Sequence, residues 1–388
     1  MKFFLTAALL LAETELPAAN PLTVLWAGPG ILVASLMIAW GAEATQFFLA
    51  QGIALAVLAL LQTLPEFAME AVFAWHQQVP FLFASLTGAL LLLTGLGWPM
   101  IYFSAARAYR REFKRRPMLR IRLEAVHSVQ VLALFVAIAY EGIVWWKGTL
   151  AIYDGVALIA IYLGYVWIMG RLPPEKPERI DEIAAVPRSI ILARRPVRIA
   201  AILFLFIAGG AVVFLVANPF LQGLFGLALL AGIPRCQFVQ WIAPLVSEAP
   251  EGISAYYWAR DPYRAPIALM NLVSSNINQW TLLAGLLPIV LSLSAGRIAS
   301  IPLDAEQSRD LLLTLSQSLL GAMFLLKLEL AWWEATGLFV LFVVQLAASE
   351  LHAAVTWIDF GWCAVELMRL LTGSRKAAAL RHFREVIQ

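Results

Sequence analysis

Long apolar stretches, separated by short polar segments, run along almost the whole chain of 388 residues. A helix needs about 20 mostly apolar residues to cross the hydrocarbon core of a membrane, and stretches of this length recur along the sequence. The pattern predicts an all-α integral membrane protein. Its ten expected transmembrane helices lie near residues 22–49, 52–75, 79–103, 125–146, 149–169, 198–217, 227–258, 265–294, 309–328 and 331–350.

A polar segment near the middle divides these helices into two groups of five. The expected units are an N-terminal lead-in (1–21), a first five-helix repeat (22–170), a polar cytoplasmic linker (171–197), a second five-helix repeat (198–350), and a C-terminal amphipathic segment with a basic tail (351–388). Since five is odd, two similar halves would lie in opposite orientations, as in many secondary transporters. Within the tail, residues 353–371 form either an interfacial helix or an eleventh span.

Composition supports a membrane protein, and the distribution of charge gives its orientation. Hydrophobic residues make up 61% of the chain and charged residues 14%, whereas a soluble domain is about a quarter charged. Basic residues concentrate in the loops 105–122 and 171–198, which two expected helices separate. Loops of this kind face the cytoplasm, so we expect both there, with the protein in the plasma (inner) membrane. The expected partners are the lipid bilayer and inorganic cations, and no nucleic acid.

Two short segments carry the candidate chemistry, Leu64-Pro65-Glu66 in the first half and Ala249-Pro250-Glu251 in the second. A proline inside a helix removes a backbone donor and bends the helix, so we expect a kink at each segment. A carboxylate beside the freed carbonyls supplies the oxygen ligands that hard cations prefer, and ionisable residues inside a membrane are functional by default. Glu66 and Glu251 are therefore expected to bind a cation or to carry protons.

More polar residues share these two segments. Glu70 follows Glu66 by four residues and Glu248 precedes Glu251 by three, so each pair occupies one helical face. Glu70 reaches water instead if it lies close enough to a helix end, and Glu248 bonds to a neighbouring helix instead if its side chain turns that way. Both alternatives stay open. The hydroxyl groups of Thr63 and Ser247 add further oxygens next to the carboxylates.

The helix expected at 265–294 carries too many amides and hydroxyls to face lipid. Such residues bond to other helices or line a polar interior; they are Asn271, Ser274, Ser275, Asn276, Asn278 and Gln279. The corresponding helix of the first half, 79–103, offers only Ser85, Thr87 and Thr94. The two halves are therefore unequal at this position.

Around these residues the sequence resembles the sodium/calcium exchanger and cation antiporter superfamily. Its repeats carry Gly-Thr-Ser-(Leu/Ala)-Pro-Glu, followed one helix later by Gly-Ser-Asn-x-x-(Asn/Asp). Here the matching segments are 62–66, 247–251 and 271–277. The resemblance implies ten helices in two inverted repeats that exchange Na⁺, Ca²⁺ or H⁺ by alternating access. It also implies that Glu66 and Glu251 are central ligands, with hydroxyls from Thr63, Ser247, Ser85 and Ser275.

The sequence departs from this motif at four positions, the first of which is Gln62, where the motif has Thr. Ala89 and Gln279 stand where the motif has Asn or Asp, and Glu248 stands where it has Ser. The expected cation-binding set is therefore Glu66, Glu251, Glu248, Thr63, Ser247, Ser85, Ser275, Gln279 and Glu70. Because the ligand set differs from the motif, the resemblance does not fix the ion.

The function expected from these observations is secondary active cation antiport at a carboxylate site near the membrane midplane, with Ca²⁺ or another cation moving against Na⁺ or H⁺. The alternative is a transporter-fold protein that binds an ion as a sensor or scaffold without exchange, which the Ala89 and Gln279 departures motivate. Enzymatic activity is not expected. No cofactor is expected apart from the transported cation.

Overall fold

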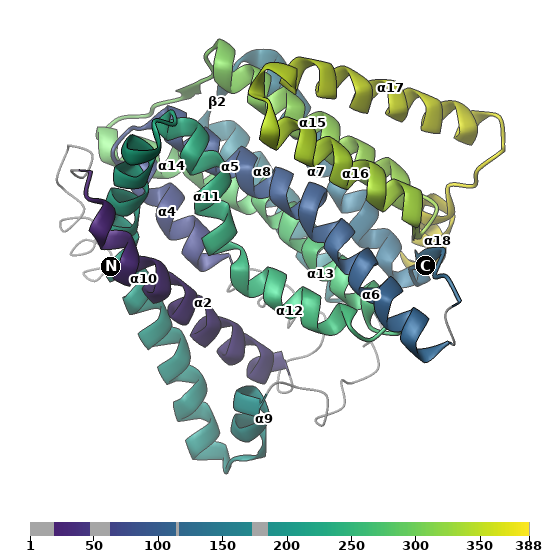
Figure 1. Ribbon diagram of the computed structural model, residues 1–388, viewed down its shortest axis with the longest axis horizontal. Coiled ribbons are helices and arrows are strands. Elements are labelled where there is room, and N and C mark those ends of the chain that lie inside the picture. Colours follow the sequence, from purple (N-terminus) through teal and green to yellow (C-terminus); the bar gives the residue numbers. More distant parts are fainter. Residues whose placement is uncertain (1–18, 47–62, 114–115, 173–184, 388) are drawn as a thin grey trace.

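The computed structural model describes residues 19–46, 63–113, 116–172 and 185–387, and most of these are helical (Figure 1). The helices of the first half are α2 (Val24–Gln46), α4 (Leu64–Trp75), α5 (Val79–Leu92), α6 (Trp98–Glu112), α7 (Ser128–Lys147) and α8 (Ile152–Met169). The later helices are α9 (Ala185–Leu192), α10 (Arg195–Ala231), α11 (Arg235–Ser247), α12 (Ala249–Ala259), α13 (Ala265–Asn278), α14 (Ala284–Ala295), α15 (Ala305–Leu325), α16 (Trp332–Ala347), α17 (His352–Leu371) and α18 (Ala378–Ile387).

Two π-helical turns each join two consecutive helices into one longer helix. Leu93–Gly97 joins α5 to α6, and Gln279–Leu283 joins α13 to α14. Short 3₁₀ turns at Pro21–Thr23, Ala125–His127 and Ser349–Leu351 lead into α2, α7 and α17. The lead-in before residue 19, the first part of the helix expected at 52–75 and the middle of the polar linker lie outside the described residues.

Within the described part of the chain, six helices are long and apolar enough to cross a membrane. They span Pro21–Thr45, Val79–Glu112, Ala125–Lys147, Ile152–Met169, Arg195–Ala231 and Ala265–Ala295. A helix is the natural form here because lipid offers no partner for a backbone N–H or C=O, so each segment must satisfy its own. The expected all-α membrane class is confirmed, while the count of ten spans stays a prediction.

The helix expected at 198–217 is longer in the structure, and the sequence boundary after it was wrong. Asn218 and Pro219 indicate a turn in the sequence, yet α10 continues through Pro219 to Ala231. Packing on another helix explains this continuity: a Cβ atom added to Gly223 would lie 2.6 Å from the backbone nitrogen of Val24. The second half of α10 therefore lies directly against the start of α2, and the two helices run side by side in Figure 1.

Two small sheets tie together loops that are far apart in the sequence. β1 (Arg120–Arg122) pairs antiparallel with β4 (Glu329–Ala331), with Ile121 opposite Leu330. β2 (Thr149–Leu150) pairs antiparallel with β3 (Ile301–Pro302). The two strands of each pair must lie on the same side of a membrane. The loops before α7 and α16 therefore lie on the same side as each other. The loops before α8 and α15 likewise lie on the same side as each other.

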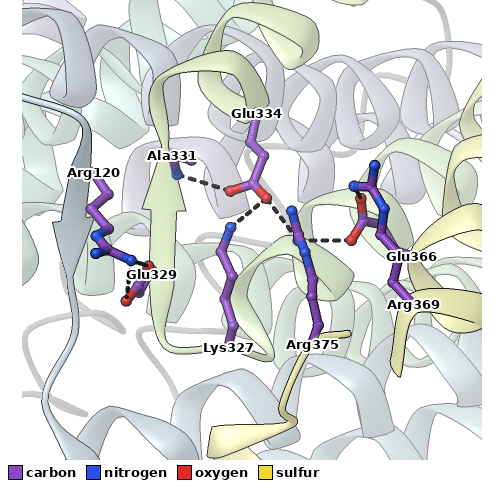
Figure 2. A network of polar contacts seen from close by, with 8 residues as sticks. All are labelled: Arg120, Lys327, Glu329, Ala331, Glu334, Glu366, Arg369 and Arg375. Atoms are coloured by element: carbon purple, nitrogen blue, oxygen red, sulfur yellow. Dashed lines mark hydrogen bonds and ion pairs between the residues drawn. The ribbon is translucent and has the colours of Figure 1, made fainter. Parts of the chain in front are cut away.

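The C-terminal helices pack on the rest of the protein and do not extend from it. α17 begins beside the end of α16, where the His352 ring lies 3.1 Å from the Gln345 carbonyl oxygen. It ends beside the start of α16, where Arg375 bridges Glu334 (3.0 Å) and Glu366 (2.7 Å) (Figure 2). α17 is therefore antiparallel to α16 and covers its length.

Buried charges reinforce this junction. The Lys327 ammonium also donates to Glu334, and Arg369 donates to Glu366 at 2.9 Å. Both carboxylates are almost fully buried, so the cations around them compensate charge that burial would otherwise make costly. Glu329 pairs with Arg120 at the partly exposed sheet edge (Figure 2). It therefore lies outside the carboxylate site.

Candidate cation site

The first carboxylate segment opens the helix α4. Thr63 is its N-cap residue, a proline occupies its first turn, and Glu66 is the acidic residue of that turn. A proline in the first turn lacks an N–H that the helix does not use, and a carboxylate there interacts favourably with the helix dipole. Glu66 and Glu70 are both buried, with exposed fractions of 2% and 0%.

The second carboxylate segment lies where one helix ends and another begins. α11 ends at Ser247, α12 starts at Ala249, and Glu248 stands between them. For this second segment, the prediction of a proline kink inside one continuous helix was therefore wrong; for the first segment, the residues before Thr63 lie outside the described ones. Pro250 falls in the first turn of α12, where the helix does not use the N–H that proline lacks. Glu248 and Glu251 are 3% and 2% exposed.

A third element, the end of α13 with its π-helical turn, brings the two segments together. The Gln279 amide donates to Glu66 at 2.9 Å and to Glu248 at 2.5 Å. The Ser275 hydroxyl donates to Glu251 at 2.5 Å, and the Asn278 amide donates to the Thr63 hydroxyl at 2.6 Å. The polar face of the helix expected at 265–294 therefore points at both carboxylate segments.

The carboxyl groups also lie close enough to influence one another electrostatically. Glu248 lies within electrostatic range of Glu66 and of Glu251, and the shared Gln279 donor brings the carboxylates of Glu66 and Glu248 to one side chain. Glu70 lies within electrostatic range of Glu66 and Glu248. These side chains would repel one another if all were ionised, so a proton or a cation among them is stabilising.

Several oxygen atoms of this cluster still have free acceptor capacity. Among the described residues, no donor reaches one oxygen each of Glu66, Glu248 and Gln279, or either oxygen of Glu70. Buried acceptors of this kind are costly unless satisfied, and carboxylate and amide oxygens are the ligands that Ca²⁺ takes. The described residues nevertheless contain no group of three His, Cys, Asp or Glu side chains arranged to hold a metal ion. A bound cation would therefore need amide or backbone oxygens as well, or a shift of the Gln279 side chain.

Three expected site residues are not hydrogen-bonded into this network within the described part of the chain; one is Glu70, whose two carboxylate oxygens no donor reaches there. The Ser247 hydroxyl donates to the Ala243 carbonyl of its own helix at 3.2 Å. Ser85 is buried on α5, and no hydrogen bond within the described part of the chain links it to the carboxylates. Conversely, sequence reasoning did not select Asn278 or Asn276, which bonds Thr94 at 3.3 Å. Their signal was the unusual density of amides in one apolar helix.

Carboxylates buried near helix starts, in a protein with several membrane-length helices, are typical of an ion-transport site. The family model for sodium/calcium exchanger proteins matches residues 19–171 and 201–349. The chain belongs to this family, and the resemblance inferred from the sequence is confirmed.

Solved structures place the chain further within this class. The crystal structure of the H⁺/Ca²⁺ exchanger CAX is 32% identical to the chain, with a TM-score of 0.86, and the match covers 99% of this chain and 97% of CAX. The sodium-calcium exchanger NCX_Mj, soaked with 2.5 mM Na⁺ and 0.1 mM Sr²⁺, is 18% identical with a TM-score of 0.56, covering 84% and 98%. The second likeness shows a shared fold. A comparison with curated proteins gives no match.

Proposed function

We propose that the chain is a secondary active antiporter that exchanges Ca²⁺ for protons at the Glu66–Glu248–Glu251 cluster. The observation that carries this proposal is the Gln279 amide, which donates to Glu66 and to Glu248 together, with Glu251 within electrostatic range of Glu248. Protons and a divalent cation compete for such a set, because each neutralises charges that are costly to leave unpaired in a membrane. The likeness to an H⁺/Ca²⁺ exchanger supports protons as the counter-ion.

The ligands proposed for the cation are the oxygens of Glu66, Glu248, Glu251 and Gln279, with Glu70, Thr63 and Ser275 completing the surroundings. Ser85 and Ser247 would join only if their helices shift, since the present contacts do not include them. Ca²⁺ takes six to eight oxygens in flexible geometry, which suits a mixed set of carboxylates and amides. Protonation of the carboxyl groups releases the cation.

The proposed architecture is ten core spans in two inverted five-helix repeats, with α17 as an additional span. The strand pairs support it, because β1 precedes the fourth expected span and pairs with the strand before the tenth, while β2 precedes the fifth and pairs with the strand before the ninth. A two-fold axis in the membrane plane relates β1 to β3 and β2 to β4, and it therefore turns the pair β1–β4 into the pair β3–β2. The loops 105–122 and 171–198 are proposed to face the cytoplasm from the plasma membrane.

The test is Ca²⁺ uptake into proteoliposomes under an imposed pH gradient, under a Na⁺ gradient and without a gradient. We expect uptake driven by the pH gradient. We also expect that Glu66→Gln and Glu251→Gln abolish it while Glu329→Gln, at the sheet edge, leaves it unchanged. Thermal unfolding of each purified variant establishes that it is folded.

Three outcomes would contradict the proposal. Ca²⁺-dependent stabilisation without flux would support the sensor or scaffold reading instead. Uptake driven only by Na⁺ would overturn the counter-ion, and full activity of both carboxylate variants would overturn the site.

A further inference from the structure

A cavity of about 740 Å³ lies apart from the carboxylate cluster, between the end of α6 and the start of α16. One part of its lining is basic, with Arg107, Arg110 and Arg111 from the last turns of α6. The other part is apolar and aromatic, with Phe103 and Trp332. Polar and apolar walls thus meet in one cavity at the end of a membrane helix.

Hydrogen bonds fix the walls of this cavity. The Tyr102 hydroxyl donates to the Met118 carbonyl, which holds the loop after α6 against that helix. The Trp332 backbone N–H donates to the Leu119 carbonyl at 3.0 Å, next to the β1–β4 ladder that holds α16 in register with the same loop. The cavity is therefore built by contacts among three separate segments.

The charge of the basic wall is not compensated within the described residues. Arg107, Arg110 and Arg111 are exposed, form no ion pair there, and no acidic residue lines the cavity with them. Arginines three and four residues apart share a helical face, where like charges repel one another. A bound phosphate group would remove this repulsion and accept several of the guanidinium hydrogen bonds.

The apolar wall indicates what kind of molecule the phosphate group belongs to. The side chains of Phe103, Leu119 and Trp332 are 42%, 60% and 52% exposed, and exposed aromatic residues at a helix end lie in the membrane interface. A free phosphate ion leaves them uncovered, whereas acyl chains cover them. We propose that this cavity binds an anionic glycerophospholipid, with its phosphate on the three arginines and its acyl chains along Phe103 and Trp332.

The test measures retained lipid and thermal stability of the full-length protein in nanodiscs. The nanodiscs contain either dioleoyl phosphatidylcholine alone or the same lipid with dioleoyl phosphatidylglycerol. The variant Arg107→Gln/Arg110→Gln/Arg111→Gln is compared with a control, Arg122→Gln/Arg194→Gln/Arg195→Gln, which loses the same charge at exposed arginines outside the cavity. Further arms add inorganic phosphate or use Trp332→Ser.

We expect phosphatidylglycerol to raise the Tm of the wild type and the control alike. The cavity variant should lose most of that rise and retain at least twofold less phosphatidylglycerol by mass spectrometry, and Trp332→Ser should also weaken retention. Equal lipid effects on the cavity and control variants would overturn the proposal, because attraction to general surface charge would explain them. An equal rise in Tm from inorganic phosphate would overturn the lipid as occupant. If the triple variant does not fold, Arg110→Gln replaces it in the same comparison.

Discussion

At the residue scale, the site is organised by an amide as well as by its carboxylates. Gln279 donates to Glu66 and to Glu248, which come from different halves of the chain. A donor shared by two acids favours their ionised forms and keeps two like charges at a fixed separation. Gln279, a position that departs from the family motif, therefore sets how the carboxylates of Glu66 and Glu248 lie relative to each other.

This role predicts a shift in the pH dependence of exchange. In Gln279→Leu the two carboxylates lose their common donor, so protons compete better with Ca²⁺ and half-maximal Ca²⁺ uptake moves to higher pH. A charged-group hydrogen bond of about 1.5–3 kcal/mol corresponds to roughly one pH unit or more. The measurement is Ca²⁺ uptake against pH in proteoliposomes. Thr281→Val is the control, because the Thr281 hydroxyl donates to the Ile277 carbonyl one turn earlier and, among the described residues, to no carboxylate. An unchanged or lower midpoint would contradict the role given to Gln279.

At the scale of the elements, close helix packing rests on glycines that face a neighbouring backbone. A Cβ atom on Gly88 of α5 would lie 1.8 Å from the Gln240 carbonyl oxygen of α11. Gly88→Ala must therefore push α5 and α11 apart, and overpacking of this kind costs about 1–3 kcal/mol. We expect a lower Tm in detergent for Gly88→Ala. Gly210→Ala in α10 should match or exceed the wild type, since nothing lies within 4 Å of its Cβ position. Equal Tm values for the two variants would contradict this packing.

The sequence predicted the positions of the helices better than the points at which they end or break. Hydrophobic length identified the helices, and the paired carboxylate segments identified residues that the structure brings within contact, because proline and glutamate are unusual in apolar stretches. The continuation of α10 through Pro219 and the break at Glu248 were missed. Whether a proline breaks, bends or starts a helix depends on packing partners, and α2 is far from α10 in the sequence. Likewise, the pattern could not tell that Ser247 turns back onto Ala243 while Ser275 reaches Glu251.

At the scale of the whole molecule, the C-terminal region is attached through ion pairs to the buried carboxylates of Glu334 and Glu366. Arg375→Gln leaves Glu334 with Lys327 and Glu366 with Arg369, but removes the bridge between them. Loss of hydrogen bonds from a charged donor to two buried carboxylates should lower the free energy of unfolding by about 2 kcal/mol and make the tail easier to cleave with trypsin. Unfolding in denaturant and timed proteolysis measure both effects. Arg381→Gln is the control, because its side chain is 73% exposed and exposed pairs contribute little. Equal stability of the two variants would show that the bridge does not hold the tail.

The same contacts predict on which side of the membrane the chain ends. Ser374 precedes Arg375, which binds Glu334 beside β4, and β4 pairs with β1 in the basic loop. Ile298 is 87% exposed and lies just before β3, in the loop that pairs with β2. With Cys236 and Cys363 replaced by Ser and Ala, a membrane-impermeant thiol reagent added to intact cells should label the Ile298→Cys variant. It should label the Ser374→Cys variant only after permeabilisation, because basic loops face the cytoplasm. Labelling of both variants in intact cells would mean that α17 does not cross, and the reversed pattern would invert the orientation of every helix.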